Sequence, residues 1–189
     1  KNKILITIAI LSQIFLSKNL LSQEIDIKAS DIEFSNNQNL TIANNATAII
    51  KKDGIIIKGE RIKYFKDKSF LFIENGKILT TSENFEIDSN IIEYKVDESN
   101  LHLKENVIIK DYINNLVMKS NEINYDLKKR KISSLNYSEI NDEFDNIYKV
   151  DKFEYSINDR IIKLDNLIAT DKNKNSFLVD LSFLDLNKK

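Results

Sequence analysis

Apolar and polar residues alternate through most of the chain with a period of two, rather than the 3.6 of a helix. In "IIIKGERIKYF" (55–65), Ile55 and Ile57 fall on one face, and "FEIDSNIIEYK" repeats the pattern with Phe85 and Ile87. Alternation carried by β-branched and aromatic residues is typical of strands. The pattern therefore predicts an all-β protein.

The alternating pattern itself recurs about every thirty residues. Aromatic residues mark it at spacings of 30, 30, 31 and 30: Phe34, Tyr64, Tyr94, Tyr125 and Tyr155. An apolar residue lies two positions before each of them: Ile32, Ile62, Ile92, Ile123 and Phe153. Fixed self-similarity of this length indicates stacked units that share one core.

Each unit contains a first strand, a polar turn and a second strand. First strands are expected at 55–65, 85–95 and 116–126. Second strands are expected at 40–50, 70–80, 101–111 and 160–170. Each second strand is interrupted near its middle by polar residues that include an asparagine: Asn45, Asn75, Asn106 and Asn166.

The apolar face changes parity within each first strand. Ile55 and Ile57 share one parity, whereas Ile62 and Tyr64 share the other. The same change separates two further pairs: Ile87 from Ile92, and Met118 from Ile123. Strict alternation would put such pairs on opposite faces, so a corner or bulge must return them to a common interior. We therefore predict a folded-over antiparallel β-sheet, of jellyroll or solenoid type, with one apolar interior along its length.

The fourth unit is less regular than the others. Its segment "ISSLNYSEINDEFDN" (132–146) loses the apolar alternation and becomes acidic. We interpret it as a loop insertion or a local defect at the edge of the sheet.

The first residues have the pattern of a secretory signal peptide. "KNK" is followed by an apolar run over Ile4–Leu16 and then by polar residues. The run is too short to cross a bilayer comfortably, which favours a signal peptide over a membrane span. We expect cleavage after Ser22, which divides the chain into a signal peptide at 1–22 and one domain at 23–189. An uncleaved anchor is the alternative.

Composition excludes several kinds of site. The absence of Cys excludes disulfides and thiolate metal sites. A net charge of -1 without a basic stripe argues against nucleic acid as a partner. His102, the single histidine, falls at an outward strand position, and Gly54, Gly59 and Gly76 form no phosphate loop. Paired acidic residues lie in turns, so we expect no enzymatic activity, no metal and no cofactor, and an enzyme acting on polysaccharide is the weakest alternative.

Repeated units of the form "IIIKGERIKYFKDKSFLFIENGKILTT" behind a signal-like leader resemble the OstA-like domain of lipopolysaccharide transport proteins, the LptD/OstA family. The segments "IENGKI" and "LKENVII" stand where that family has an "xGxV" element; Gly76 fits it and Asn106 departs from it. The resemblance covers roughly Ile25–Leu186. It implies a β-jellyroll, open at both ends, whose interior shields the acyl chains of lipid A in the periplasm.

The resemblance also implies partners and a location. Domains of this kind join end to end by edge-strand pairing with other OstA-like jellyrolls, between the inner membrane and the translocon of the outer membrane. Lipopolysaccharide is the implied ligand, and the periplasm, in association with the outer membrane, is the implied location. Residues at matching repeat positions are expected to line the lipid-binding interior: Ile55, Ile57, Ile62, Tyr64, Phe85, Ile87, Ile92, Tyr94, Met118, Ile123 and Tyr125.

Two alternatives remain within this architecture. The segment from Asn146 onward resembles the periplasmic domain of the translocon, which continues into a β-barrel, and we favour that member of the family. A stand-alone bridge protein of the LptA type is the first alternative. A structural β-solenoid with a closed core and no ligand is the second, and polar interruptions such as "NGK" and "KEN" in the second strands count against it.

Overall fold

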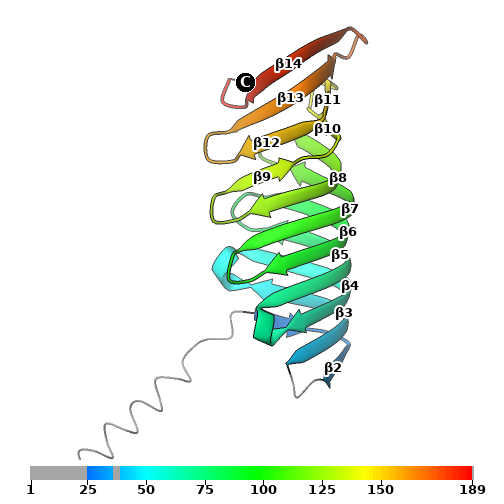
Figure 1. Ribbon diagram of the computed structural model, residues 1–189, viewed down its shortest axis with the longest axis vertical. Coiled ribbons are helices and arrows are strands. Elements are labelled where there is room, and N and C mark those ends of the chain that lie inside the picture. The colour runs from blue at the N-terminus through cyan, green and yellow to red at the C-terminus, as the bar shows by residue number, and fades with distance from the viewer. Residues whose placement is uncertain (1–24, 36–38, 189) are drawn as a thin grey trace, which may run out of the picture.

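The computed structural model describes residues 25–35 and 39–188. The signal peptide predicted at 1–22 lies outside them. In the described part of the chain, fourteen strands form one antiparallel sheet, stacked along the long axis of the molecule from β2 at one end to β14 at the other (Figure 1). No helix in these residues is long and apolar enough to cross a membrane.

Six long strands form the middle of the stack. They are β3 (Leu40–Ile50), β4 (Ile55–Phe65), β5 (Phe70–Thr80), β6 (Phe85–Lys95), β7 (Asn100–Asp111) and β8 (Leu116–Asp126). Each pairs with the next along the chain. Short 3-10 turns join two of the pairs: η1 (Lys51–Asp53) and η2 (Lys66–Lys68). At one end, two short strands pair with the two halves of β3: β1 (Ile25–Lys28) and β2 (Asp31–Ser35).

The other end of the stack also uses pairs of short strands. The elements are β9 (Lys131–Ser134), β10 (Ser138–Asn141), β11 (Ile147–Val150), β12 (Lys152–Ser156), β13 (Ile161–Thr170) and β14 (Ser176–Asp185). Strands β9 and β10 pair with the two halves of β8, and β11 and β12 pair with the two halves of β13. Of the two interpretations given for 132–146, a loop insertion or a local defect at the edge of the sheet, the loop insertion is therefore wrong. This segment continues the sheet, with a break between β9 and β10 at 135–137 and a turn between β10 and β11.

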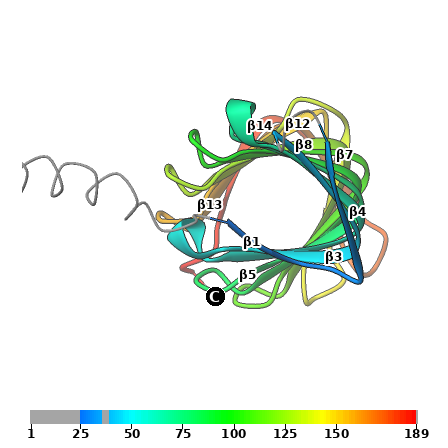
Figure 2. The ribbon, with the colours of Figure 1, turned by 90° about the horizontal axis from the view of Figure 1, so that it is seen from below.

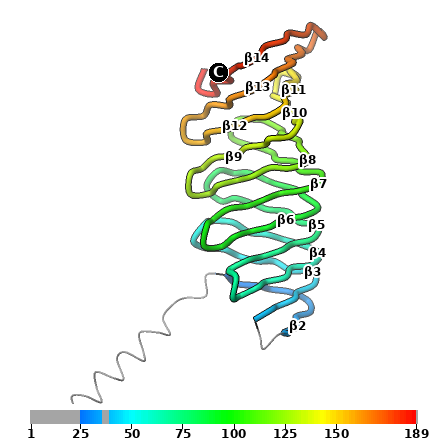
Figure 3. The backbone as a smooth tube through the Cα atoms, viewed as in Figure 1, coloured from blue at the N-terminus to red at the C-terminus, as the bar shows by residue number. Residues whose placement is uncertain are grey.

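Each long strand turns a corner, so that the sheet folds over into two walls, as the view along the long axis shows (Figure 2). The tube in Figure 3 shows the resulting stack of rungs. In the second strands, the corner coincides with an asparagine of positive φ, between 46° and 54°: Asn45, Asn75, Asn106 and Asn166. Asparagine tolerates this left-handed conformation better than most residues. The polar interruptions seen in the sequence are therefore the corners of the fold.

The first strands turn the corner at small residues. Gly59 pairs with Gly76, and a Cβ on Gly59 would lie only 2.4 Å from Cγ2 of Ile73. The equivalent Ser89 is buried, and its hydroxyl donates to the carbonyl oxygen of Lys104 at 2.8 Å. Side chains on both sides of each corner then face one interior, which confirms the predicted change of parity and the predicted fold class, an all-β, folded-over antiparallel stack of thirty-residue repeats.

The outward face of the sheet is polar. The Lys63 ammonium lies 2.8 Å from Oε1 of Glu74 on the neighbouring strand. His102 lies between two carboxylates, with Nδ1 at 3.3 Å from Glu93 and Nε2 at 2.5 Å from Glu122. The structure thus confirms the outward position predicted for His102. Partly exposed ion pairs of this kind contribute little to stability, but they keep the outer face hydrated.

Candidate functional site: an apolar interior closed along a seam

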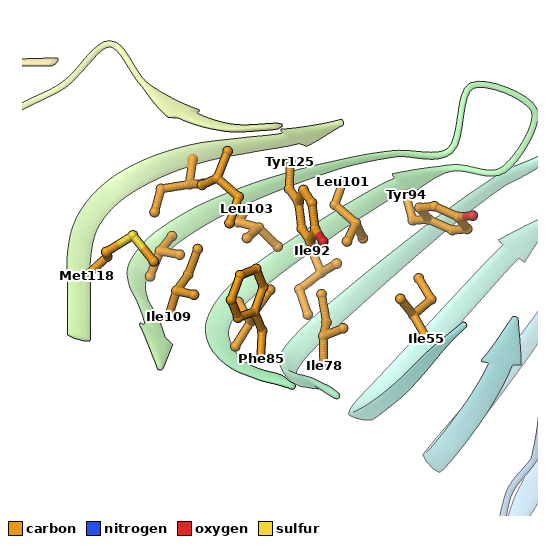
Figure 4. Packing of buried hydrophobic residues seen from close by; sticks show 14 of the residues in the cluster. Ile55, Ile78, Phe85, Ile92, Tyr94, Leu101, Leu103, Ile109, Met118 and Tyr125 are labelled. Atoms are coloured by element: carbon orange, nitrogen blue, oxygen red, sulfur yellow. The ribbon is translucent and has the colours of Figure 1, made fainter. Parts of the chain in front are cut away.

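Ten of the eleven residues predicted to line the interior belong to one apolar cluster, of which Figure 4 labels Ile55, Phe85, Ile92, Tyr94, Met118 and Tyr125. Ten of the eleven are no more than 2% exposed. The eleventh, Tyr64, is half-buried and packs against the same cluster. Their role in lipid binding stays a prediction, because the structure shows only where they lie.

The second strands contribute as much to the interior as the first strands, although sequence reasoning selected only first-strand positions. Buried second-strand residues include Leu71, Ile73, Ile78, Leu101, Leu103 and Ile109. Their alternation within the expected strands at 70–80 and 101–111 was the signal that could have identified them. Both walls therefore present a continuous apolar surface to the interior.

The interior opens into a hollow at the β1–β2 end of the described stack. This hollow has a volume of about 330 Å³ and is lined by Ile25, Ile27, Ile32, Phe34 and Tyr64, among others. Phe34 is 62% exposed and Ile32 is 39% exposed. The first aromatic position of the repeat is therefore not buried as the later ones are, because β2 pairs only with β3 in the described residues.

Opposite the corners, turns of the two walls face each other along a line that we call the seam. One wall contributes the turns at 51–54, 81–84 and 112–115, and the other contributes those at 96–99, 127–130 and 157–160. Within the residues that the structure describes, no strand pairing and no backbone–backbone hydrogen bond crosses this line. Side chains alone close the interior on this side.

Two contacts close the seam near η1. The Lys52 ammonium donates a hydrogen bond of 2.6 Å to the carbonyl oxygen of Val96. The hydroxyl of Tyr94 donates to the carboxylate of Asp53. Tyr94 is fully buried, so this predicted interior residue also takes part in closing the seam.

An ion pair between a buried carboxylate and a partly exposed arginine closes the seam at the next turn. Oε1 of Glu83 lies 3.3 Å from Nη2 of Arg130, and the Glu83 side chain is only 7% exposed. A charge at this depth needs a partner, because a buried unpaired carboxylate is strongly unfavourable. The pair therefore ties the two walls together.

A buried polar network closes the seam one repeat further along the stack. The hydroxyl of Tyr155 donates to Oδ2 of Asp111 at 3.0 Å, and the Asn114 amide donates to that hydroxyl oxygen at 2.9 Å. Nη2 of Arg160 donates to the Asn114 amide oxygen at 2.6 Å. Burial and the nearby Asp111 carboxylate raise the pKa of Tyr155. Its hydroxyl therefore keeps its proton and acts as a donor.

Aromatic rings pack directly beneath this network. The centroid of the Phe85 ring lies 6.2 Å from that of Tyr125 and 6.4 Å from that of Tyr155. Both tyrosines belong to the opposite wall. Tilted ring pairs at this distance are favourable, so Phe85 joins the walls below the polar contacts.

Sequence reasoning treated the seam residues as ordinary turn residues. The available signal was the recurrence of arginine at positions 130 and 160, one repeat apart, in a chain with 28 basic residues of which three are arginine. The seam brings together acidic, basic and amide side chains, but no group of three or more potential ligands in the described residues is arranged to hold a metal ion. The arrangement can enclose apolar groups and recognise polar ones at its edge.

Comparison with known proteins finds similarity among solved structures. No family model and no curated protein matches the chain. Among solved structures, the chain is similar to LptH from Pseudomonas aeruginosa, described as the LptA-homologous periplasmic component of the conserved lipopolysaccharide transport device. The similarity covers 86% of this chain and 94% of that one, with 11% sequence identity and a TM-score of 0.31. The fold described above therefore rests on the strands and pairing of this chain itself.

Proposed function

We propose that the protein binds lipid acyl chains in its interior and takes part in lipopolysaccharide transport in the periplasm. The observation that carries this proposal is a continuous apolar interior that side chains alone close along one side. The walls can separate at the seam without breaking any strand pair, whereas backbone ladders hold them together at the corners.

The free energy gained by burying an acyl chain is similar in size to the free energy of the contacts that close the seam. Burial of an acyl chain of about twelve carbons contributes ~9 kcal/mol at 0.8 kcal/mol per CH₂ group. A hydrogen bond contributes about 0.5–1.5 kcal/mol, and one to a charged group about 1.5–3 kcal/mol. The summed free energy of a few seam contacts is thus comparable to that of burying one acyl chain, and burial of a lipid with several chains contributes more than these contacts. Lipid binding is therefore strong enough to offset the opening of the seam.

The finer proposal is that the chain is the periplasmic domain of the outer-membrane translocon, with a stand-alone bridge protein of the LptA type as the alternative. Both roles require joining to other jellyroll domains through edge strands. In the described residues β14 pairs only with β13, and Leu178 and Phe183 on β14 are 81% and 60% exposed. We propose this edge as the surface for such a partner.

A second candidate function is a structural β-stack with no ligand. It is favoured by the complete burial of most interior residues, including Ile57, Ile87 and Ile123. In this case the seam contacts would serve only to stabilise the fold.

Photocrosslinking with lipopolysaccharide separates the two functions. A photoreactive residue replaces Ile87, which is fully buried, or Asp88, the next residue on β6, whose side chain is 37% exposed on the outer face. We expect a lipid adduct at position 87 and none at position 88, with circular dichroism confirming that both variants are folded. A folded position-87 variant without an adduct would refute the lipid proposal and leave the structural stack as the function.

A further inference from the structure

Three buried hydrogen-bond donors without an acceptor occur along one part of the seam. They are the Tyr125 hydroxyl and the Nε groups of Arg130 and Arg160. In the part of the chain that the structure describes, only one other buried side-chain polar atom lacks a partner, Oδ1 of Asn141. Each buried donor without an acceptor costs about 1–3 kcal/mol. Of the three, the two arginine Nε groups belong to residues that line one hollow, and such a pair suits a group rich in acceptor oxygens.

The two arginines occupy equivalent positions in consecutive repeats. Each is the last residue of its turn and has a positive φ, 52° at Arg130 and 55° at Arg160. The equivalent positions in the preceding turns of the same wall are Ser69 and Ser99, with φ values of 46° and 52°. A residue with a long side chain seldom adopts this left-handed backbone conformation. Its occurrence at two consecutive turns of one wall therefore needs an explanation.

Arg160 is unusual in its surroundings as well as its backbone. Its guanidinium is half-buried, and its hydrogen-bond acceptor is the neutral amide oxygen of Asn114. No carboxylate among the described residues forms an ion pair with it. A partly buried cation without an anionic partner is unfavourable, and an anion that reaches it relieves that cost.

The arginines line a hollow in the seam with a volume of about 180 Å³. Its polar rim includes both arginines, Asn114 and the carboxylates of Glu83 and Asp111, and Phe85 adds apolar surface to it. The Asp111 carboxylate accepts hydrogen bonds from Asn114 and from the Tyr155 hydroxyl, so it is already occupied. This volume corresponds to roughly six water molecules, at about 30 Å³ each. The hollow is therefore large enough for one compact polar group, and Phe85 places it directly above the apolar interior.

We propose that this hollow binds the phosphate monoester headgroup of an amphiphile whose acyl chain continues past Phe85 into the interior. A guanidinium group matches phosphate through paired Nε and Nη donors. The headgroup replaces Glu83 as the partner of Arg130 and Asn114 as the partner of Arg160, and the Glu83 carboxylate moves into water as its turn is released. This exchange releases the turns that close the seam, so headgroup binding and acyl-chain entry occur together. The proposal rests on the lipid-binding function proposed above.

Titration calorimetry with two amphiphiles of equal chain length tests this site. The probes are dodecyl phosphate and the uncharged dodecyl maltoside, each below its micelle concentration, together with inorganic phosphate alone. The test variant is Arg130→Gln with Arg160→Gln. The control is Arg61→Gln, which changes the third arginine of the chain, an exposed residue of β4. We expect the wild type and the control to bind dodecyl phosphate at least tenfold more tightly than dodecyl maltoside, and the double variant to lose this preference.

A further variant tests the site even if the double variant does not fold. Glu83→Gln removes the competing carboxylate and leaves every donor in place, so it should bind dodecyl phosphate several-fold more tightly than the wild type. Weaker binding by this variant would count against the exchange of partners. Circular dichroism establishes that each variant is folded.

The possible results distinguish the site from the function on which it rests. Equal binding of both amphiphiles by wild type and double variant would overturn the headgroup site and leave the lipid-binding function in place. Binding of neither amphiphile would overturn both. Binding of inorganic phosphate as tightly as dodecyl phosphate would show a site for free phosphate and overturn the role of the acyl chain.

Discussion

Replacement of Phe85 by leucine should weaken the attachment of the two walls. The Phe85 ring contacts Tyr125 and Tyr155 across the seam, at centroid distances of 6.2 and 6.4 Å. Leucine keeps an apolar side chain but removes both ring pairs, which contribute about 0.5–1.5 kcal/mol each beyond burial. The smaller side chain also leaves part of the space unfilled. We therefore expect the free energy of unfolding to fall by about 2–4 kcal/mol.

Phe72→Leu provides the matched control. Phe72 is a half-buried residue on the outward face of β5, and its ring lies 5.3 Å from the Lys63 ammonium. A cation–π contact at such a site contributes about 0.5–1 kcal/mol, so this variant should lose no more than about that amount. Urea unfolding followed by circular dichroism measures both variants, and each kcal/mol should also shift Tm by roughly 2–4 °C for a chain of this size.

Equal losses of stability in the two leucine variants would refute the reasoning, because they would show that Phe85 contributes no more than a surface ring. A functional consequence accompanies the expected result. If Phe85→Leu loosens the seam, less of the lipid's binding energy is needed to open it. Lipid adduct formation at photoreactive position 87 should then increase at a fixed lipid concentration.

Further predictions concern the corners and the turns. Asn75→Val should cost about 1–2 kcal/mol and Asn75→Gly almost nothing, because the φ of 48° resists β-branched residues; thermal unfolding compares the two variants. Gly59→Ala should cost about 1–3 kcal/mol because its Cβ would lie 2.4 Å from Cγ2 of Ile73, and an unchanged Tm would contradict this. Burial raises the pKa of Asp142, but hydrogen bonds within its own turn outweigh this effect and hold the pKa below its ordinary 3.8. The stabilising effect of Asp142 is therefore complete above pH 3.8 and is lost as the pH falls through the lower pKa of the folded protein. Urea midpoints measured near neutral pH and near pH 2 should differ less in Asp142→Asn than in the wild type. Burial raises the pKa of Tyr148 to about 12 from its ordinary 10.0. The stabilising effect of Tyr148 is therefore present below pH 10.0 and is lost as the pH rises towards about 12. An alkaline absorbance titration follows its ionisation, and circular dichroism recorded in parallel follows unfolding.

The long strands could be predicted almost to the residue. The strands expected at 55–65 and 85–95 are β4 and β6, and β7 begins at Asn100, one residue before its expected start. Alternation and turn residues are both local signals, and the repeat supplies each of them several times. The position of each corner followed from the change of parity for the same reason.

The fourth unit was misjudged because its strands are too short to show alternation. Strands β9 and β10 have four residues each, and each buries a serine at the corner, Ser134 and Ser138. These hydroxyls form hydrogen bonds with Ser120, at 2.9 and 3.0 Å. A serine whose hydroxyl is buried in a hydrogen bond cannot be told from a serine in a solvent-exposed loop by composition alone. The segment therefore looked like a polar loop in the sequence.

The seam could not be predicted because its register depends on the tilt of the strands. Its hydrogen-bonded partners are 41 to 46 residues apart, about one and a half repeats. Lys52 contacts Val96, which lies beyond η2, the next turn along the chain. Such an offset follows from the geometry of the whole sheet, whereas a repeat in the sequence fixes only the spacing of neighbouring strands.

The corners and the seam are held by different interactions, and this difference connects the fold to the proposed function. Backbone ladders and left-handed asparagines such as Asn75 hold the corners, so substitutions on the outer face leave them intact. Side chains such as Glu83 and Arg130 hold the seam, so a single substitution there changes the cost of opening without changing any strand pair. A closed structural stack and a lipid-binding jellyroll therefore differ in a few turn residues. The affinity of this protein for lipid should follow the chemistry of its seam more closely than the composition of its core.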